Sequence, residues 1–176
     1  MAAYDVDVRA GGGKWRSLER GSQVTARTFR GSAGQTYTFR MRARSRDNLE
    51  SGYVTDTTVV PLDDRSKRLK YSKGWRRVPS RGSYGRTISA GPRHSRLRLR
   101  FRGSRVALIA PRSAGGGRIA VHIDGQRRKV VHLRGDASER RVVYRSGKLK
   151  RGRVHTLVVR VLSRGSTRLD AVAVHR

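Results

Sequence analysis

Strict alternation of apolar and polar residues is the feature that most constrains the fold of this chain. Its clearest example is Arg96-Leu-Arg-Leu-Arg-Phe-Arg102, in which every second residue is apolar. Side chains of a β-strand point alternately to the two faces of its sheet, so Leu97, Leu99 and Phe101 are expected to enter a core. The solvent face of this strand would carry Arg96, Arg98, Arg100 and Arg102. No 11-residue window shows the apolar stripe of a helix, and the sequence therefore predicts an all-β protein.

The first 60 residues repeat this pattern in short runs. The run Tyr37–Ala43 places aromatic and apolar side chains on one face, and threonine and arginine on the other. Short strands separated by turn residues are typical of antiparallel β units. We expect five strands here, near residues 4–8, 15–18, 24–29, 37–43 and 53–60.

Short apolar runs continue to the end of the chain. Asp124-Gly125 predicts a hairpin, because these two residues readily supply the positive φ angles of a type I′ turn. Residues 157–162 and 169–174 are nearly continuous apolar runs, which predicts central strands covered on both faces. The expected strands are 69–78, 86–90, 96–102, 105–110, 118–123, 128–134, 139–144, 153–162 and 167–174.

Charge divides the chain into two parts. Residues 1–64 hold 10 basic and 8 acidic residues, whereas residues 65–176 hold 32 basic and 4 acidic residues. Such asymmetry indicates two units with different surfaces. Pro61, followed by charged residues, is typical of an exposed connection. We therefore predict a first domain at 1–63, a linker at 64–69 and a second domain at 70–176.

A surplus of 28 positive charges opposes the compaction of the second part, since like charges repel. An anionic polymer is the partner that would relieve this repulsion. Guanidinium groups on alternate residues of one strand lie about 6.6–6.8 Å apart and can meet successive carboxylates or phosphates. The candidate polyanion-binding residues are Arg96, Arg98, Arg100, Arg102, Lys148, Lys150, Arg151 and Arg153.

The first part resembles a known family. Gly34-Gln-Thr-Tyr-Thr-Phe-Arg-Met-Arg-Ala-Arg, together with the segments beginning at Tyr4 and Gly52, is similar to the later strands of a fibronectin type III domain, an immunoglobulin-like β-sandwich. The resemblance implies that Tyr37 bonds through its hydroxyl to the backbone at a corner of the sheet. It covers about residues 4–61 and lacks the family's two opening strands, so it implies a truncated domain that begins in mid-sandwich.

The second part resembles the jelly-roll modules of the galactose-binding-like superfamily. The segments that carry the likeness are Tyr71–Trp75, Phe101–Pro111, Val121–Gly125 and Leu169–Val174. Such modules follow fibronectin type III domains in secreted actinobacterial proteins, and many are thought to bind carbohydrate. The resemblance therefore implies an antiparallel sandwich, an extracellular or cell-surface location and a polysaccharide ligand.

Other chemistries have little support in the residues. Asp170 lies in an apolar run, which predicts a buried structural acid paired with an arginine. The chain has no cysteine and its five histidines show no zinc spacing, so no metal or cofactor is expected. No apolar run is long enough to span a membrane as a helix. Tyr84, Trp75 and Tyr71 are the candidates for stacking against a sugar ring.

The sequence thus predicts a non-catalytic adhesion or binding protein. Its partner would be a polysaccharide or an anionic cell-wall polymer. One alternative is an accessory fragment of a secreted glycoside hydrolase or protease whose catalytic domain lies outside this chain. A second alternative is non-specific nucleic-acid binding, which basic patches support but no recognition helix does. The residues do not decide the oligomeric state.

Overall fold

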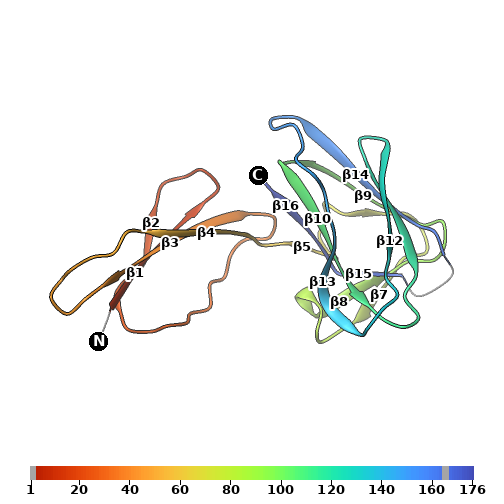
Figure 1. Ribbon diagram of the computed structural model, residues 1–176. Helices are drawn as coiled ribbons and strands as arrows, with labels where there is room; N and C mark the ends of the chain where they lie inside the picture. Colours follow the sequence, from red (N-terminus) through yellow and green to blue (C-terminus); the bar gives the residue numbers. More distant parts are fainter. Residues whose placement is uncertain (1–2, 164–166) are drawn as a thin grey trace. The chain divides into compact units, whose positions relative to one another are not determined.

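The computed structural model describes residues 3–163 and 167–176, and across these ranges it contains no α-helix. The strands pair in antiparallel ladders and divide into two compact units, Met1–Val60 and Pro61–Arg176 (Figure 1). The all-β fold class is confirmed.

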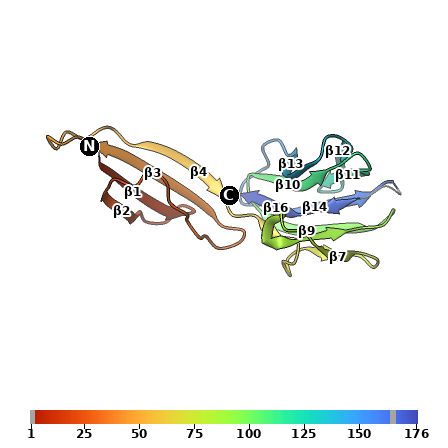
Figure 2. The same cartoon turned by 90° about the horizontal axis from the view of Figure 1, so that it is seen from below.

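Unit 1 is a single four-stranded sheet. Its strands are β1 (Ala3–Ala10), β2 (Arg16–Ser22), β3 (Thr36–Arg44) and β4 (Val54–Val59). They lie in the order β2-β1-β3-β4 (Figure 2). The strand expected at 24–29 does not form: Val24 is 67% exposed, and this segment pairs with no other. Instead, Phe29 packs edge-on against the rings of Tyr37 and Phe39.

One face of this sheet is apolar and only partly covered. A groove of about 570 Å³ runs along it between Val6, Leu18, Phe29 and Met41. The hydroxyl of Tyr37 accepts a hydrogen bond of 2.9 Å from the backbone N–H of Ser32, five residues upstream. This is the backbone contact expected at that position.

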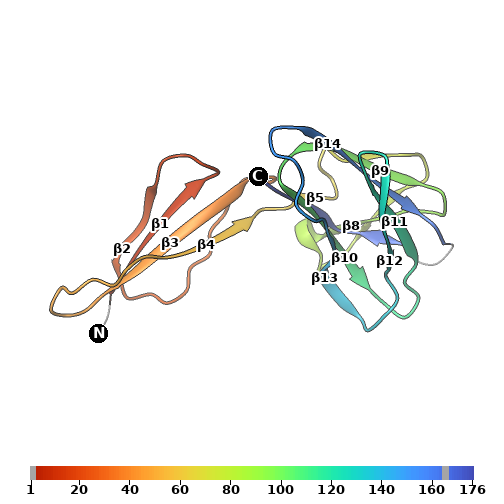
Figure 3. The ribbon, with the colours of Figure 1, turned by 45° about the horizontal axis from the view of Figure 1, so that its top comes forward.

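Unit 2 is an antiparallel sandwich of two larger sheets with a smaller third. One sheet has the order β13-β10-β16-β5, the second β12-β11-β14-β9-β6 and the third β15-β8-β7. Figures 1 and 3 show β10 and β13 in one layer and β9 and β12 in the other. The strands are β5 (Leu62–Asp63), β6 (Lys70–Tyr71), β7 (Arg76–Pro79), β8 (Thr87–Ala90), β9 (Arg96–Arg102), β10 (Arg105–Arg112), β11 (Arg118–Ile123), β12 (Gln126–His132), β13 (Ser138–Arg145), β14 (Val154–Val161), β15 (Arg168–Leu169) and β16 (Ala171–His175).

The core of unit 2 fills the space between the two larger sheets. Leu97, Leu99 and Phe101 of β9 are at most 2% exposed, as their alternation predicted. They share one apolar cluster with Leu108 of β10 and Val172 of β16, both from the opposite sheet. The outer faces of the two sheets consequently point in opposite directions.

The expected linker at 64–69 belongs instead to the body of unit 2. Leu62 and Asp63 form the edge strand β5, which pairs with β16. Asp64 is fully buried and accepts hydrogen bonds from the hydroxyls of Thr87 and Ser89 at 2.6 and 2.8 Å, while Leu69 is 5% exposed in the core. The boundary therefore lies at residues 60 and 61. The charged segment after Pro61 has the composition of a linker, because the hydroxyl groups that bind the buried Asp64 come from remote parts of the chain.

Two other strand predictions also need correction. The single strand expected at 69–78 is divided into β6 and β7 by the turn before Trp75. Only one face of β14 is buried, because Thr156 and Val158 are half-buried on the outer face of the sheet; β16, in contrast, is covered on both faces. The hairpin at Asp124-Gly125 is confirmed, with φ angles of 53° and 83° at the two turn residues.

Candidate functional site: a basic sheet face

The four arginines of β9 are exposed on the outer face of the five-stranded sheet. The strand alternates exposed and buried residues from end to end, since its other face forms the core. We call Arg96, Arg98, Arg100 and Arg102 the arginine ladder. Within the described part of unit 2, the ion pairs are Arg65–Asp63 and His155–Asp124. The ladder therefore has no carboxylate partner there.

Neighbouring strands extend the cationic surface. Lys70 of β6 lies opposite Arg98, and Arg160 of β14 lies opposite Arg96. A shallow groove of about 430 Å³ lies beside Arg96, Arg98 and Arg160, and its lining includes Thr156 and Val158. One carboxylate, that of Asp124, also lines the groove, and it is already engaged by other groups. The face offers a line of cations beside a small apolar floor.

Asp124 is held by residues at the start of β14. Its Oδ2 lies 2.7 Å from Nδ1 of the His155 ring, and its Oδ1 accepts a hydrogen bond of 2.8 Å from the N–H of Thr156. Burial alone would raise the pKa of Asp124, but these hydrogen bonds bring it below its usual range. The carboxylate is thus ionised and committed to the fold.

The other basic candidates lie on the loop 147–153, which we call the basic loop. The N–H of Leu149 donates to the carbonyl of Ser104 at 2.8 Å, and the carbonyl of Lys150 lies 2.9 Å from Nε2 of His155. Arg153 precedes Val154, which pairs with Arg102, so Arg153 adjoins one end of the ladder.

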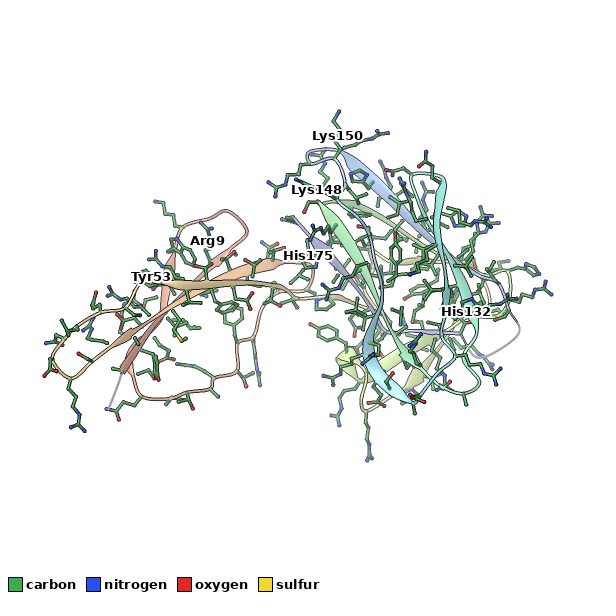
Figure 4. All side chains as sticks on the ribbon, in the orientation of Figure 1. Arg9, Tyr53, His132, Lys148, Lys150 and His175 are labelled. Atoms are coloured by element: carbon green, nitrogen blue, oxygen red, sulfur yellow. The ribbon has the colours of Figure 1, made fainter. Side chains whose placement is uncertain are left out.

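Lys148 and Arg151 have a different position from the ladder. They line a separate pocket beside Arg105 and His175, on the sheet that contains β10. Figure 4 shows Lys148 and Lys150 on the basic loop and His175 near the C-terminus. The structure therefore divides the predicted basic residues between two surfaces.

The aromatic candidates are placed unequally. The rings of Tyr71 and Trp75 lie 5.0 Å apart, and both pack against the core. Burial, the largest effect, raises the pKa of Tyr71 to about 12. The Tyr84 ring belongs to a short 3₁₀ turn at residues 84–86 and is only half-buried. Of the three candidates, Tyr84 is the one that does not belong to the core cluster.

Asp170 is fully buried, as expected, but its partner differs from the one predicted. Its two carboxylate oxygens accept hydrogen bonds of 2.9 and 3.1 Å from the backbone N–H of Tyr84, and no arginine within the described ranges forms an ion pair with it. Burial is the main cause that raises its pKa to about 6, and the nearby Asp64 adds to the effect. A backbone partner from a remote turn leaves no trace in local sequence.

Unit 1 has a polar face that the sequence did not reveal. Asp5 and Asp7 of β1 are 2% and 1% exposed, beneath arginines of β2 and β3. The guanidinium of Arg40 lies 4.4 Å from the centre of the Trp15 ring and 4.3 Å from that of Tyr53. The guanidinium of Arg9 lies 4.5 Å from the centre of the same Trp15 ring. Figure 4 labels Arg9 and Tyr53 on this unit. The charges of this face are largely neutralised internally, in contrast to the ladder.

Within residues 3–163 and 167–176, no three histidine, aspartate or glutamate side chains gather where they could hold a metal ion. Nor does this part of the chain include a helix of the length and hydropathy that crossing a membrane requires.

Comparisons with known proteins give few relatives. No model of a protein family matches the chain, and a search of curated proteins finds no match. Among solved structures, the salicylyl-acyltransferase SsfX3 from a tetracycline biosynthetic pathway is similar at a TM-score of 0.48 and 16% identity, over 65% of this chain and 39% of that one. An exo-β-1,3-galactanase from Phanerochaete chrysosporium, solved with galactose, is similar at 0.47 and 11%, over 78% of this chain and 40% of that one. The chain thus spans about two fifths of each structure's length.

Proposed function

We propose that unit 2 binds an anionic polymer, most simply an acidic polysaccharide, through the arginine ladder and the cations beside it. The observation that supports this is the exposed row of four arginines on one face of β9, with no carboxylate partner among the described residues. Arginine forms bidentate contacts with carboxylate, sulfate and phosphate groups alike. A regular row of such groups suits an extended ligand with repeating charge.

The proposed role is non-catalytic adhesion outside the cell or at its surface. Of the four acids after residue 65, Asp124 is engaged by His155, and Asp170 is buried against the Tyr84 backbone. Both carboxylates are thus bound by groups of the fold itself, which does not favour a role as the general acid or the nucleophile of glycoside hydrolysis. The ladder, in contrast, needs no chemistry beyond charge and hydrogen bonding.

A salt titration with two polymers tests the proposal. Affinity for heparin should fall linearly with the logarithm of salt concentration, because binding releases counterions. Dextran, a neutral glycan, should bind far more weakly at low salt. Equal, salt-independent binding of both polymers would contradict the electrostatic role. Tighter binding of single-stranded DNA than of heparin at matched charge would instead favour a nucleic-acid ligand.

Paired substitutions test whether the ladder is the site. Replacing Arg98 and Arg100 by Gln removes two exposed charges and leaves the apolar face of β9 unchanged. We expect heparin affinity to fall at least about tenfold, which corresponds to about 1.4 kcal/mol. The matched control is Arg127→Gln with Arg128→Gln, on β12 at the far edge of the same sheet. Equal losses from both pairs would show a diffuse charge effect and no localised site.

A further inference from the structure

A second cationic site lies on the outer face of the other large sheet. A pocket of about 500 Å³ opens where the start of β10, the end of β13, the basic loop and the end of β16 meet. We call it the β10–β13 pocket. Its ionisable lining residues are Arg105, Arg145, Lys148, Arg151 and His175.

Small residues leave room for this pocket. Ala107 and Gly147 line it beside the longer cationic side chains and fill little of its volume. The wall is held by Ser146, whose hydroxyl accepts a hydrogen bond from the N–H of Val106 at 3.0 Å and donates one to the carbonyl of Gly147 at 2.8 Å. Strand pairing sets Arg105 opposite His175 and Ala107 opposite Arg145. The cations are thus brought together by the sheet itself.

The pocket holds positive charge without a counter-charge. No aspartate or glutamate lines it, and the ion pairs within the described part of unit 2 are elsewhere. The pKa of the His175 ring is lowered below its ordinary value. Burial is the largest cause, and the positive charges of Arg145 and Arg105 add to it. A bound anion would reverse the electrostatic part of this effect.

We propose that the β10–β13 pocket is an anion-binding site for a single tetrahedral oxyanion, a sulfate or phosphate group that is either free or esterified to a sugar. Two guanidinium groups provide bidentate donors, and the basic loop supplies further charge. This site is separate from the arginine ladder, because the two lie on opposite outer faces of the sandwich. It requires neither an extended polymer nor the function proposed above.

Binding at this pocket is expected to be coupled to the protonation of His175. The charged groups that line the pocket together with its ring are Arg105 from β10, Arg145 from β13, and Lys148 and Arg151 from the basic loop, and the first two act on its pKa. All are cationic, so the anion is the group that favours the imidazolium form. By linkage, the anion should bind more tightly at lower pH, and its binding should raise the pKa of His175.

Sulfate is the probe of choice, because its charge is constant between pH 5 and pH 8. The whole chain, labelled for detection of histidine ring signals, is titrated with sodium sulfate at constant ionic strength. We expect the His175 signals to shift in a saturable manner, with affinity greater at pH 5.5 than at pH 7.5. Glucose 6-phosphate against glucose then tests whether the group is recognised when it is carried on a sugar.

Variants separate the pocket from general charge. Arg105→Gln with Arg145→Gln should weaken sulfate binding at least about tenfold, since two charge-assisted contacts are lost. Arg127→Gln with Arg128→Gln, which removes the same charge from β12, should change it less than about twofold. Lys148→Ala with Arg151→Ala is a second test of the pocket. Both side chains are exposed on the basic loop, so this pair should weaken sulfate binding without unfolding the chain.

Two results would overturn the proposal: equal weakening by the pocket and control pairs, or a His175 ring that does not respond to sulfate. Its failure is distinguishable from that of the proposed function. Because heparin itself carries sulfate groups, the paired variants are what separate the two sites. Heparin affinity that Arg98→Gln with Arg100→Gln lowers no more than the Arg127 and Arg128 control pair, with sulfate binding intact, would refute the ladder only. Sulfate binding that Arg105→Gln with Arg145→Gln leaves unchanged, with the ladder effect intact, would refute the pocket only.

Discussion

The buried ring of His155 and the partly exposed carboxylate of Asp124 form an ion pair that joins strand β14 to the β11–β12 turn. Nδ1 of the ring lies 2.7 Å from the carboxylate, and Nε2 lies 2.9 Å from the carbonyl oxygen of Lys150. Because both neighbours are acceptors, both ring nitrogens must carry a proton. The hydrogen bond that the ring donates to Asp124 is the main cause that raises the pKa of His155, with burial opposing it.

This pair predicts a loss of stability on the alkaline side. The folded-state pKa of His155 lies above its ordinary value of 6.5, so its contribution is complete below 6.5 and is lost as the pH rises through the folded-state pKa. Thermal melting of the chain between pH 5.5 and pH 8.5 measures this loss. Asp124→Asn retains a residue suited to the positive φ of the turn but removes the charge, and should cost about 1–3 kcal/mol at pH 6. An unchanged pH profile in this variant would contradict the assignment of an imidazolium.

Asp170 predicts a second pH effect, in a lower window. Its pKa is about 6 in the folded state against an ordinary 3.8, so the folded state binds the proton more tightly. Stability should therefore fall as the pH rises from about 4 to about 6, by roughly 3 kcal/mol at 1.36 kcal/mol per pKa unit. Denaturant unfolding of Asp170→Asn, which cannot ionise, should lack this slope. A slope equal to that of the parent chain would assign the effect to another group.

The position of the domain boundary predicts how shortened chains behave. A chain of residues 61–176 contains Leu62, Asp64 and Leu69 and should melt at the temperature of unit 2 in the whole protein. A chain of residues 70–176 loses two core leucines and the buried partner of two hydroxyls. Since each Leu→Ala change in a core costs about 2–5 kcal/mol, it should unfold well below that temperature. Equal melting temperatures of the two chains would show that residues 64–69 are a linker after all.

Unit 1 should be the less protected of the two units. Its sheet has one layer, and the apolar groove beside Phe29 and Met41 gives solvent access to the side that would otherwise be a core. Amide exchange in residues 3–60 should be faster than in residues 61–163. Local opening of a one-layer sheet exposes little apolar area, so its free energy cost is low. Exchange followed by mass spectrometry measures both units at once. Equal protection would mean that another chain covers the groove, and dilution should then accelerate the exchange of unit 1.

The parts of the structure that could be predicted are those in which neighbouring residues carry the signal. The ladder strand and the Asp124-Gly125 turn follow from alternation and from turn chemistry, so both lie where they were expected. The errors concern residues whose partners are distant. Asp64 needs hydroxyls more than 20 residues away, and Asp170 needs a backbone N–H 86 residues away.

The candidate sites follow the same rule. The four ladder arginines occupy one strand and could be grouped from the sequence alone. The β10–β13 pocket unites Arg105, Arg145 and His175 from three strands, and the pairing of those strands is not encoded by any local pattern. Arginines at strand ends recur throughout the second half of the chain. Nothing in the sequence therefore distinguishes Arg105 and Arg145 from the others.

The opposed outer faces of unit 2 have a consequence for any anionic surface that the protein coats. The arginine ladder and the β10–β13 pocket lie on different sheets, so a molecule adsorbed through one of them keeps the other turned toward solvent. A saturated layer would then present cations outward, and the electrophoretic mobility of coated anionic particles would change sign. Such particles, each now positive, would attract bare negative ones and flocculate at partial coverage.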